Sequence, residues 1–400
     1  MKILHWEEMF HPSFGYQINI LAKFQAMQGH DVTIMSPERI TEHPYFSNFA
    51  QEGDLDAGDA EYTRIYGVKI IRMPWKRVVS GRVIYKRGYI EKIKSFDADI
   101  VFVHTNDTIS AINIARKHKR INKPLIFDNH MVEVASENRY SGLFRKAFRT
   151  FVSPIVKKNK WIVFRTQDID FINKAYGLPE ELTPFLSFGT DTTLFHPDDE
   201  VKKAFRAELD IADNDFVVVY TGKINEGKGG KLFANTIKDK FPVDKNIVFI
   251  IVGSTSAEYG KEVEPLFAQS ENRVIRFPTQ EYQNLAKFYQ AGDLSVFPHQ
   301  SSLSFYDAQA CELPVISDDD KLNVDRVAHG NGFSFKTGDI NDFRDKILKC
   351  AQMDCAEYDK MKKNSYDFVI NGYDYADIAR ECSDIMEKEI ERFKSERASK

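Results

Sequence analysis

Short apolar runs that alternate with stretches of helical periodicity limit what this 400-residue chain can fold into. Lys2–Trp6 is such a run, followed by a Pro- and Gly-bearing loop at His11–Gly15 and by helical spacing over Tyr16–Gln28. Gly29 is a stop signal for that helix, and Asp31–Ser36 resumes the strand pattern. Further strands are predicted at Lys69–Met73, Asp99–His104, Pro124–Asp128 and Trp161–Arg165. This alternation predicts a parallel sheet with helices on both faces.

The same pattern starts again after residue 197. Strands that end in glycine are predicted at Asp215–Gly222 and Asn246–Gly253, and others at Arg273–Phe277, Leu294–Pro298 and Pro314–Ser317. Ser187–Pro197 is interpreted as a hinge, and a charged periodic helix over Tyr375–Phe393 follows the last strand. At about 150 residues per domain, the length allows two to three domains. We therefore predict an α/β chain of two Rossmann-like domains that face a cleft, where ligands bind at the carboxyl ends of the strands.

Composition excludes several classes of protein. Hydrophobic residues make up 42% and charged residues 28%, which is typical of a soluble globular chain. The net charge of −4 argues against a dedicated nucleic-acid binder. All four cysteines lie after residue 310, which suits a reducing compartment. Glu7 and Glu8 stand where a signal peptide needs its apolar core, so we expect a cytoplasmic protein.

The segment Tyr220–Gly229 carries the first chemical signal. A strand ends at Gly222, Lys223 follows directly, and Lys228 lies in a Gly-rich turn before a helix that begins near Lys231. Exposed backbone N–H groups, a helix N-terminus and two ammonium groups suit a pyrophosphate. A solvated Lys/Gly loop is the alternative, because short motifs of this kind often occur by chance.

The segment Phe297–Val315 carries the second signal. A strand ends at Pro298, and a Ser-rich loop leads into a helix predicted over Phe305–Cys311. Hydroxyls before a helix suit a phosphate, and Asp307 in the first turn suits a pair of vicinal hydroxyls. The alternative is structural: Ser304 caps the helix, and Asp307 favours its positive end.

Taken in order, these motifs resemble those of retaining glycosyltransferases of the GT-B fold, family four, also called group 1. The matching segments are Pro12–Gly15, Gly29–Pro37, Ala98–His104, Lys123–His130, Ser187–Pro197, Gly222–Gly229, Ala291–Pro298 and Asp307–Asp318. The resemblance implies an acceptor-binding domain over residues 1–190 and a nucleotide-sugar-binding domain over residues 191–372. It also implies a terminal helix, residues 373–400, that returns to the first domain.

The resemblance also implies roles for individual residues. Lys223 and Lys228 would bind the donor pyrophosphate and stabilise the leaving diphosphate, and Asp307 would hold the ribose where relatives have glutamate. His130 would act beside the transferred sugar, with a core histidine as the alternative. Other predicted donor-binding residues are Gly15, Gly222, Phe277, Thr279, Ser302, Leu303 and Ser304. The predicted acceptor side is Tyr16, Gln17 and His104.

Two positions depart from the family pattern. Tyr16 replaces the second glycine of the N-terminal loop, and His299 stands where relatives have a glutamate that contacts the donor sugar. Three explanations stay open: backbone groups around Ser301–Ser304 replace this glutamate, the donor specificity is unusual, or activity is reduced. The acidic run Asp318–Asp320 is interpreted as a solvated loop. We therefore expect no metal and no cofactor.

A basic block offsets the near-neutral total charge. Residues 72–165 contain 21 Lys/Arg and seven Asp/Glu, a net charge of +14. Within it, Leu143–Lys158 mixes aromatic, aliphatic and basic residues, with Pro154 as an interruption. Such a surface can lie on anionic lipid, and ordinary solvated helix faces are the alternative. The resemblance favours the first reading, because many relatives act on lipid-linked acceptors at the inner membrane face. It thus implies an anionic membrane surface as a candidate partner, with a peripheral location on that face.

Taken with these features, the resemblance implies a retaining, metal-independent glycosyltransferase. It would move a sugar from a nucleotide-sugar, taken as a UDP-sugar, to a glycan or lipid-linked acceptor in polysaccharide or glycolipid biosynthesis. One alternative is a degenerate GT-B protein that binds nucleotide without transfer. Another is a sugar-nucleotide epimerase or hydrolase, which would need carboxylates near the sugar that the segment 301–304 does not supply.

Overall fold

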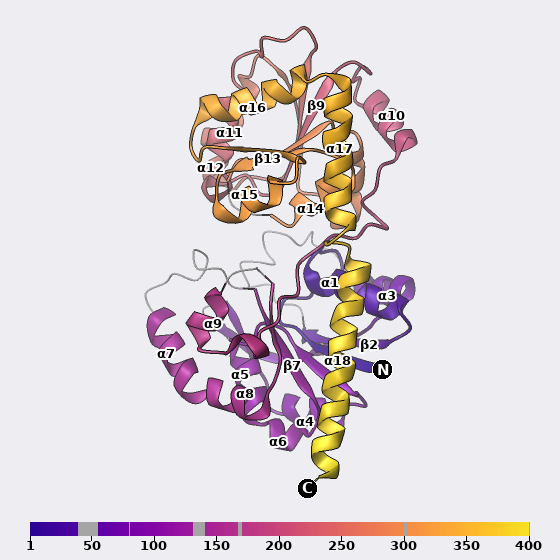
Figure 1. Ribbon diagram of the computed structural model, residues 1–400, viewed down its shortest axis with the longest axis vertical. Coiled ribbons are helices and arrows are strands. Elements are labelled where there is room, and N and C mark those ends of the chain that lie inside the picture. The colour runs from indigo at the N-terminus through magenta and orange to yellow at the C-terminus, as the bar shows by residue number, and fades with distance from the viewer. Residues whose placement is uncertain (39–54, 80, 131–140, 167–169, 300–301, 400) are drawn as a thin grey trace. The chain divides into compact units, whose positions relative to one another are not determined.

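A computed structural model describes residues 1–38, 55–79, 81–130, 141–166, 170–299 and 302–399 (Figure 1). The chain divides into two compact units. Unit 1 comprises Met1–Phe188 and Tyr375–Lys400, and unit 2 comprises Gly189–Asp374. Each unit contains a six-stranded sheet in which all neighbouring strands are parallel, so the predicted α/β class is confirmed for both.

The sheet of unit 1 has the strand order β3-β2-β1-β6-β7-β8. Its strands are β1 (Lys2–Trp6), β2 (Asp31–Pro37), β3 (Lys69–Met73), β6 (Ile100–Val103), β7 (Leu125–Asn129) and β8 (Val163–Arg165). The chain runs outward from β1 to β3 and then returns to the other side of β1. The strand order therefore reverses between β1 and β6, and ligands of open α/β sheets bind at such a point, beyond the carboxyl ends of the strands.

Helices cover this sheet where the sequence has helical periodicity. They are α1 (Gln17–Met27), α3 (Leu55–Tyr66), α4 (Tyr89–Ser95), α5 (Ile109–Arg116), α6 (His118–Ile121), α7 (Ser141–Phe151), α8 (Ser153–Asn159) and α9 (Phe171–Tyr176). Pro154 stands in the first turn of α8, where its missing N–H costs nothing, so it separates α7 from α8. An antiparallel pair, β4 (Trp75–Val79) and β5 (Arg82–Tyr85), was not predicted.

The terminal helix α18 (Tyr375–Ala398) belongs to unit 1, although it follows unit 2 in the sequence. It lies along α1 (Figure 1). The Gln28 side chain donates a hydrogen bond to the carbonyl of Ala376 (2.8 Å), and Cys382 and Met386 are fully buried. The predicted return of this helix to the N-terminal part is therefore confirmed.

The sheet of unit 2 has the order β11-β10-β9-β12-β13-β14. Its strands are β9 (Phe216–Thr221), β10 (Ile247–Val252), β11 (Arg273–Phe277), β12 (Leu294–Phe297), β13 (Val315–Asp318) and β14 (Gly332–Phe335), and β14 was not predicted. Its helices are α10 (Asp199–Glu208), α11 (Gly230–Thr236), α12 (Ala257–Ala268), α13 (Ala286–Gln290), α14 (Ser304–Ala310), α15 (Lys321–Val327), α16 (Ile340–Gln352) and α17 (Cys355–Ile370). Every residue of β9 and β10 is buried, as expected for strands covered on both faces. The strand order reverses between β9 and β12.

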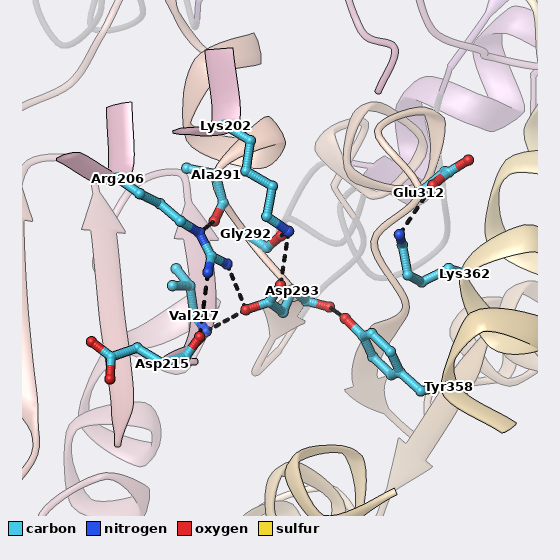
Figure 2. A network of polar contacts seen from close by, with 10 residues as sticks. All are labelled: Lys202, Arg206, Asp215, Val217, Ala291, Gly292, Asp293, Glu312, Tyr358 and Lys362. Atoms are coloured by element: carbon cyan, nitrogen blue, oxygen red, sulfur yellow. Dashed lines mark hydrogen bonds and ion pairs between the residues drawn. The ribbon is translucent and has the colours of Figure 1, made fainter. Parts of the chain in front are cut away.

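A polar network joins helices of unit 2 to the amino-terminal ends of β9 and β12 (Figure 2). Asp293 accepts hydrogen bonds from Arg206 (2.6 Å), Lys202 (2.9 Å) and the backbone N–H of Val217 (2.8 Å). The Tyr358 hydroxyl donates to the Asp293 carbonyl (2.5 Å). One aspartate thus fixes α10 and α17 at the edge of the sheet away from the strand ends where ligands bind.

Candidate functional site

The loop between β9 and α11 depends on glycine backbones. Gly222 has a φ of 135°, and a Cβ at Gly253 would lie 1.8 Å from the Gly222 carbonyl oxygen. The loops that follow β9 and β10 therefore cross at a distance that only glycine permits. Further along, the Asn225 side chain accepts the backbone N–H of Lys228 (2.9 Å), which fixes the turn that carries this lysine.

Lys228 lies beside the end of β12. A Cβ at the neighbouring Gly229 would lie 3.2 Å from the Cβ of His299. The loop after β9 and the loop after β12 therefore touch at the point where the strand order reverses. Burial lowers the pKa of Lys228 to about 8; the negative charge of Asp318 opposes this shift and the positive charge of Arg326 adds to it. Burial also lowers the pKa of Lys223. Both predicted phosphate ligands thus belong to the same loop.

His299 is held by a buried carboxylate. Its Nδ1 lies 2.6 Å from Oδ2 of Asp318, whose Oδ1 accepts a hydrogen bond from Asn323 (2.5 Å). The expectation that Asp318 lies in a solvated loop is wrong, because it is the last residue of β13 and is fully buried. Its neighbours Asp319 and Asp320 are exposed. The Nε2 atom of His299 makes no hydrogen bond to any described residue.

Asp307 lies in the first turn of α14 and is buried. Its Oδ1 accepts hydrogen bonds from the hydroxyls of Thr190 (2.5 Å) and Tyr282 (3.4 Å). Burial raises the pKa of Asp307 to about 7, although these two hydrogen bonds act in the opposite direction. The alternative in which Ser304 caps the helix is wrong: the N-cap is Leu303, and the Ser304 hydroxyl pairs with Tyr289 instead.

The other predicted donor residues follow β11 and β12. Phe277 is the last residue of β11, and the Thr279 hydroxyl donates to Ser254 in the loop after β10 (3.0 Å). Arg276 pairs with Glu264 and donates to two backbone carbonyls, so it stabilises these loops. Ser302 precedes α14, and its carbonyl accepts the N–H of Phe305 (3.3 Å). All these residues lie at the carboxyl edge of the sheet.

In unit 1 the structure brings His130 and His104 to the same carboxylate. His104 Nδ1 lies 2.7 Å from Oδ2 of Asp128, and His130 Nε2 lies 3.3 Å from the same oxygen. Burial lowers the pKa of His130, but the Asp128 charge and hydrogen bond outweigh burial and raise it overall. Burial raises the pKa of the Asp128 carboxyl, yet the two histidines hold it well below its usual range. The ligand atoms of these three residues lie within 4.8 Å of one another, a spacing that could also hold a metal ion.

The remaining predicted residues of unit 1 lie where the loop after β1 meets α1. Gly15 precedes Tyr16, which is the N-cap residue of α1, and the Tyr16 ring packs edge-on against Phe14 at a centroid distance of 5.3 Å. Gln17 is the first residue of the helix and is buried. Its amide oxygen and nitrogen make no hydrogen bond within the described parts of the chain.

Several residues of these two sites were not predicted. Asp128 was part of a quoted motif, but only the strand pairing of β6 with β7 shows that it joins His104 to His130. Asp318 and Thr190 lie far along the sequence from their partners, so no local pattern could indicate them. Arg326 is buried against the rings of Phe305 and Tyr306, at 5.5 and 5.1 Å from their centroids.

Comparisons with known proteins cover both units. Residues 16–193 match the family model described as Glycosyltransferase Family 4, and residues 201–368 match Glycosyl transferases group 1. A D-inositol 3-phosphate glycosyltransferase of Segniliparus rotundus is 28% identical over 172 residues, which are 41% of this chain and 38% of that protein. A probable sucrose-phosphate synthase of Thermosipho melanesiensis is 23% identical over 95% of this chain and 92% of its own.

Solved structures share the fold over nearly the full length. A glycosyltransferase from Rickettsia africae superposes with a TM-score of 0.74 at 16% identity, over 97% of this chain and 98% of that one. Anabaena HepE, crystallised with UDP and glucose, superposes with a TM-score of 0.71 at 17% identity, over 97% and 100% of the two chains. No helix in the described ranges combines the length and hydropathy needed to cross a bilayer. The two parallel sheets, the sequence motifs and these matches show that the chain belongs to the group 1 glycosyltransferases, of the family-four type, with the GT-B fold.

Proposed function

We propose that the chain is a retaining glycosyltransferase that moves a sugar from a UDP-sugar to a glycan or lipid-linked acceptor. The observation that carries this proposal is the loop of Lys223 and Lys228, which meets the end of β12 where the strand order of unit 2 reverses. Two ammonium groups and a glycine backbone at such a point suit a nucleoside diphosphate. The complex of Anabaena HepE with UDP and glucose supports the choice of donor.

The donor would be held by three groups of unit 2. Lys223 and Lys228 bind the diphosphate, and Asp307 accepts hydrogen bonds from the ribose hydroxyls. Transfer with retention needs little covalent help from the protein, so catalysis consists of positioning the sugar and stabilising charge on the departing diphosphate. Lysines supply that charge without a metal. His130 of unit 1 is proposed to hydrogen-bond a hydroxyl of the transferred sugar.

A binding and hydrolysis screen tests this function. Isothermal titration with UDP, GDP and ADP identifies the base, and slow hydrolysis of a panel of nucleotide sugars identifies the donor. We expect UDP to bind most tightly and turnover to persist in EDTA. Binding of a nucleotide with no hydrolysis or transfer would instead indicate a degenerate protein. Complete loss of turnover on chelation would contradict the metal-free mechanism.

His299 is proposed to set donor specificity. It stands where relatives have a glutamate, and Asp318 fixes its Nδ1 so that Nε2 is left for a ligand. An imidazole can donate or accept one hydrogen bond at that atom, whereas a carboxylate only accepts. We expect His299→Glu to change the ranking of donors in the hydrolysis panel and to leave UDP affinity within about twofold, since the contact is with the sugar. An unchanged ranking would exclude this role.

The acceptor unit is proposed to contact an anionic membrane through α7. Leu143, Ala147 and Phe151 lie at helical spacing and are exposed, with Lys146 and Arg149 beside them. Exposed apolar side chains flanked by basic ones suit the surface of an anionic bilayer. Flotation with phosphatidylglycerol vesicles at low salt should recover the protein. Phe151→Glu should abolish recovery, and the control Ile109→Glu, an exposed residue of α5, should not. Absence of binding by the unmodified protein would exclude the membrane role.

A further inference from the structure

We propose that Gln25, His5, His104 and Asp128 form a buried chain of hydrogen bonds that positions the imidazole of His130 and fixes its tautomer. The part of this inference that concerns catalysis rests on the proposed function, because His130 acts on the sugar only if the chain is a transferase. The part that concerns the state of the imidazole does not. His5, His104, Asp128 and Gln25 are therefore positioning residues in this account.

The chain of contacts follows from three neighbouring strands. His5 is on β1, His104 comes directly after β6, and Asp128 is on β7, and these strands are adjacent in the sheet. Gln25 Oε1 lies 2.8 Å from His5 Nε2, and His5 Nδ1 lies 2.9 Å from His104 Nε2. His104 Nδ1 lies 2.7 Å from Asp128 Oδ2, and the same oxygen lies 3.3 Å from His130 Nε2.

The direction of each hydrogen bond can be assigned from the Gln25 end. Gln25 Nε2 lies 3.7 Å from the Met386 sulfur of α18, which can only accept, so the amide oxygen faces His5. His5 therefore donates from Nε2. Burial lowers the pKa of His5 to about 3, and the nearby His104 adds to this, so His5 is neutral and its Nδ1 accepts. His104 must then donate from Nε2.

The contact between His104 and Asp128 requires another proton. Since Nε2 of His104 already carries one, its Nδ1 must carry a second to donate to the Asp128 carboxylate, which the low pKa of Asp128 keeps ionised. The buried pair is then an imidazolium and a carboxylate. Asp128 Oδ1 accepts the backbone N–H of Thr105 (2.7 Å), and the Asp128 carbonyl accepts that of Asn106 (2.9 Å). The carboxylate is therefore held by His104, Thr105 and His130, and the Asn106 contact holds the backbone of Asp128.

Thr105 adopts a conformation that few β-branched residues adopt. Its φ is 59°, in the left-handed region, and this geometry points its N–H at Asp128. Such strain persists where the surrounding contacts determine it. It indicates that the position of the Asp128 carboxylate is strongly specified by the fold.

His130 lies at the exposed end of this series of hydrogen bonds, where neighbouring residues orient its ring. Its Nε2–H points to Asp128, and its Nδ1 lies 3.2 Å from the Thr166 hydroxyl, which can donate to it. The Phe188 ring lies 5.1 Å from the imidazole, centroid to centroid. The side chain keeps 28% of its surface exposed, so it can still meet a ligand. The other ionisable groups that act on His130 are Glu7 and Asp107, and Cys382 of α18 lies near enough to Asp128 to sense its charge.

Metal binding is the competing use of the same side chains. His104, Asp128 and His130 have the spacing of a cation site. Both ring nitrogens of His104 already have hydrogen-bond partners, however, and 2.7 Å between Nδ1 and the carboxylate is a hydrogen-bond distance. A metal ion bound by these side chains would have to displace the hydrogen bonds of His104, which lies in the middle of the hydrogen-bonded series.

The test is the state of His130 in the full-length protein, read by nitrogen-15 NMR of the histidine rings across pH. In the unmodified protein we expect the neutral form of His130 to carry its proton at Nε2. We also expect the pKa of His130 to lie above that of a free histidine. Asp128→Asn should lower its titration midpoint and populate both tautomers. His104→Gln removes the positive charge that shares the Asp128 carboxylate with His130, so it should raise the titration midpoint of His130. Gln25→Leu, at the far end of the chain, should change the ring signals of His5 and His104. His118→Gln, a histidine of unit 1 outside the chain, should change none of these.

Kinetics provide a second readout that a purely structural role would not move. If the transferase assay is active, His104→Gln should lower kcat by about tenfold or more with KM nearly unchanged, because a small displacement of a positioned group costs rate. The pH profile of kcat should shift with the NMR midpoint of His130. If no transferase activity is found but the NMR changes occur, the positioning chain stands and the proposed function fails.

Two results would overturn the proposal. One is a His130 tautomer and midpoint that stay unchanged in Asp128→Asn and in His104→Gln while thermal melts show that both variants are folded. The other is stoichiometric binding of Zn²⁺ that displaces the ring signals of His104 and His130, which would make this a metal site. If Asp128→Asn does not fold, His104→Gln and Gln25→Leu decide between the outcomes.

Discussion

At the scale of single residues, Lys228 combines a predicted role with a low pKa. We expect Lys228→Ala to lower turnover about 100-fold or more, because loss of one donor to a developing negative charge costs roughly 3 kcal/mol. Lys231→Ala is the control, since Lys231 lies near the same loop in an exposed ion pair with Glu262. Steady-state kcat for both variants is the measurement. A near-normal kcat for Lys228→Ala would remove this residue from the site.

The pKa of Lys228 also predicts a pH dependence. Because burial lowers this pKa to about 8, the ammonium loses its proton as pH rises through 8, and affinity for UDP should fall there. Lys228→Arg should keep its charge and show a weaker fall, since arginine stays protonated well above this range. Isothermal titration between pH 7 and pH 9.5 measures both proteins. Identical pH profiles would mean that another group causes the fall.

The raised pKa of Asp307 predicts that replacing its carboxyl increases the stability of unit 2 and weakens UDP binding. Its folded pKa is about 7, above the ordinary 3.8, so the folded state holds a proton that the unfolded state loses between these values. The stability of unit 2 therefore falls as pH rises through this window, and the ionised carboxylate destabilises the fold above pH 7. Asp307→Asn should melt at a higher temperature than the unmodified protein at pH 8, with a smaller difference at pH 5. It should also bind UDP more weakly. An equal difference in Tm at both pH values would contradict this account.

Individual residues show where prediction from sequence ends. Lys223 and Lys228 could be predicted as phosphate ligands because a strand, a glycine turn and a helix follow one another locally. The partner of His299 could not, because Asp318 is 19 residues away and reaches it only through the pairing of β12 with β13. His5 was not singled out for the same reason: its neighbour His104 is 99 residues away.

At the scale of elements, the Asp293 network explains how α10 and α17 are attached to the sheet of unit 2 (Figure 2). Asp293→Ala would leave Arg206, which is buried, without its carboxylate, and breaking such a pair costs about 3–5 kcal/mol. The control is Lys362→Ala, which removes a more exposed ion pair with Glu312 and should cost at most about 1 kcal/mol. Thermal or urea unfolding measures both. A small effect of Asp293→Ala would mean that the network is not a main attachment of these helices.

Helices and strands were predicted well where the apolar residues followed a single helix or strand periodicity. β1, β3 and β11 have the bounds that their apolar residues indicated, although each also contains one or two basic side chains. β4 was not predicted because Lys76 and Arg77 are exposed residues in a pair outside the main sheet, where no apolar run is required. β14 has only four residues and begins at Gly332, so it lacks the composition of a strand.

At the scale of the whole molecule, unit 2 is an insertion between two parts of unit 1. The sequence motifs indicated this arrangement only through the returning terminal helix, since no local pattern shows which segments share a core. The two ends of unit 2 lie together: the backbone N–H of Thr190 donates to the Tyr373 carbonyl (2.8 Å), and the Thr192 hydroxyl donates to Asp374 (3.0 Å). The polypeptide therefore enters and leaves unit 2 at one place.

This arrangement predicts that residues 189–374 fold alone, whereas residues 1–188 do not. The first fragment contains its whole sheet, its core and the pairing of its two ends. The second lacks α18, so the buried face of α1 that packs on Cys382 and Met386 would be exposed to water, and exposed apolar faces promote aggregation.

Residues 189–374 should unfold cooperatively on heating and bind UDP nearly as tightly as the full chain, since both lysines and Asp307 are present. A fragment of residues 189–400 is the control, because it carries α18 without its partner helix and should be less soluble. If residues 189–374 showed no cooperative transition, the core of unit 2 would depend on contacts outside its own sequence.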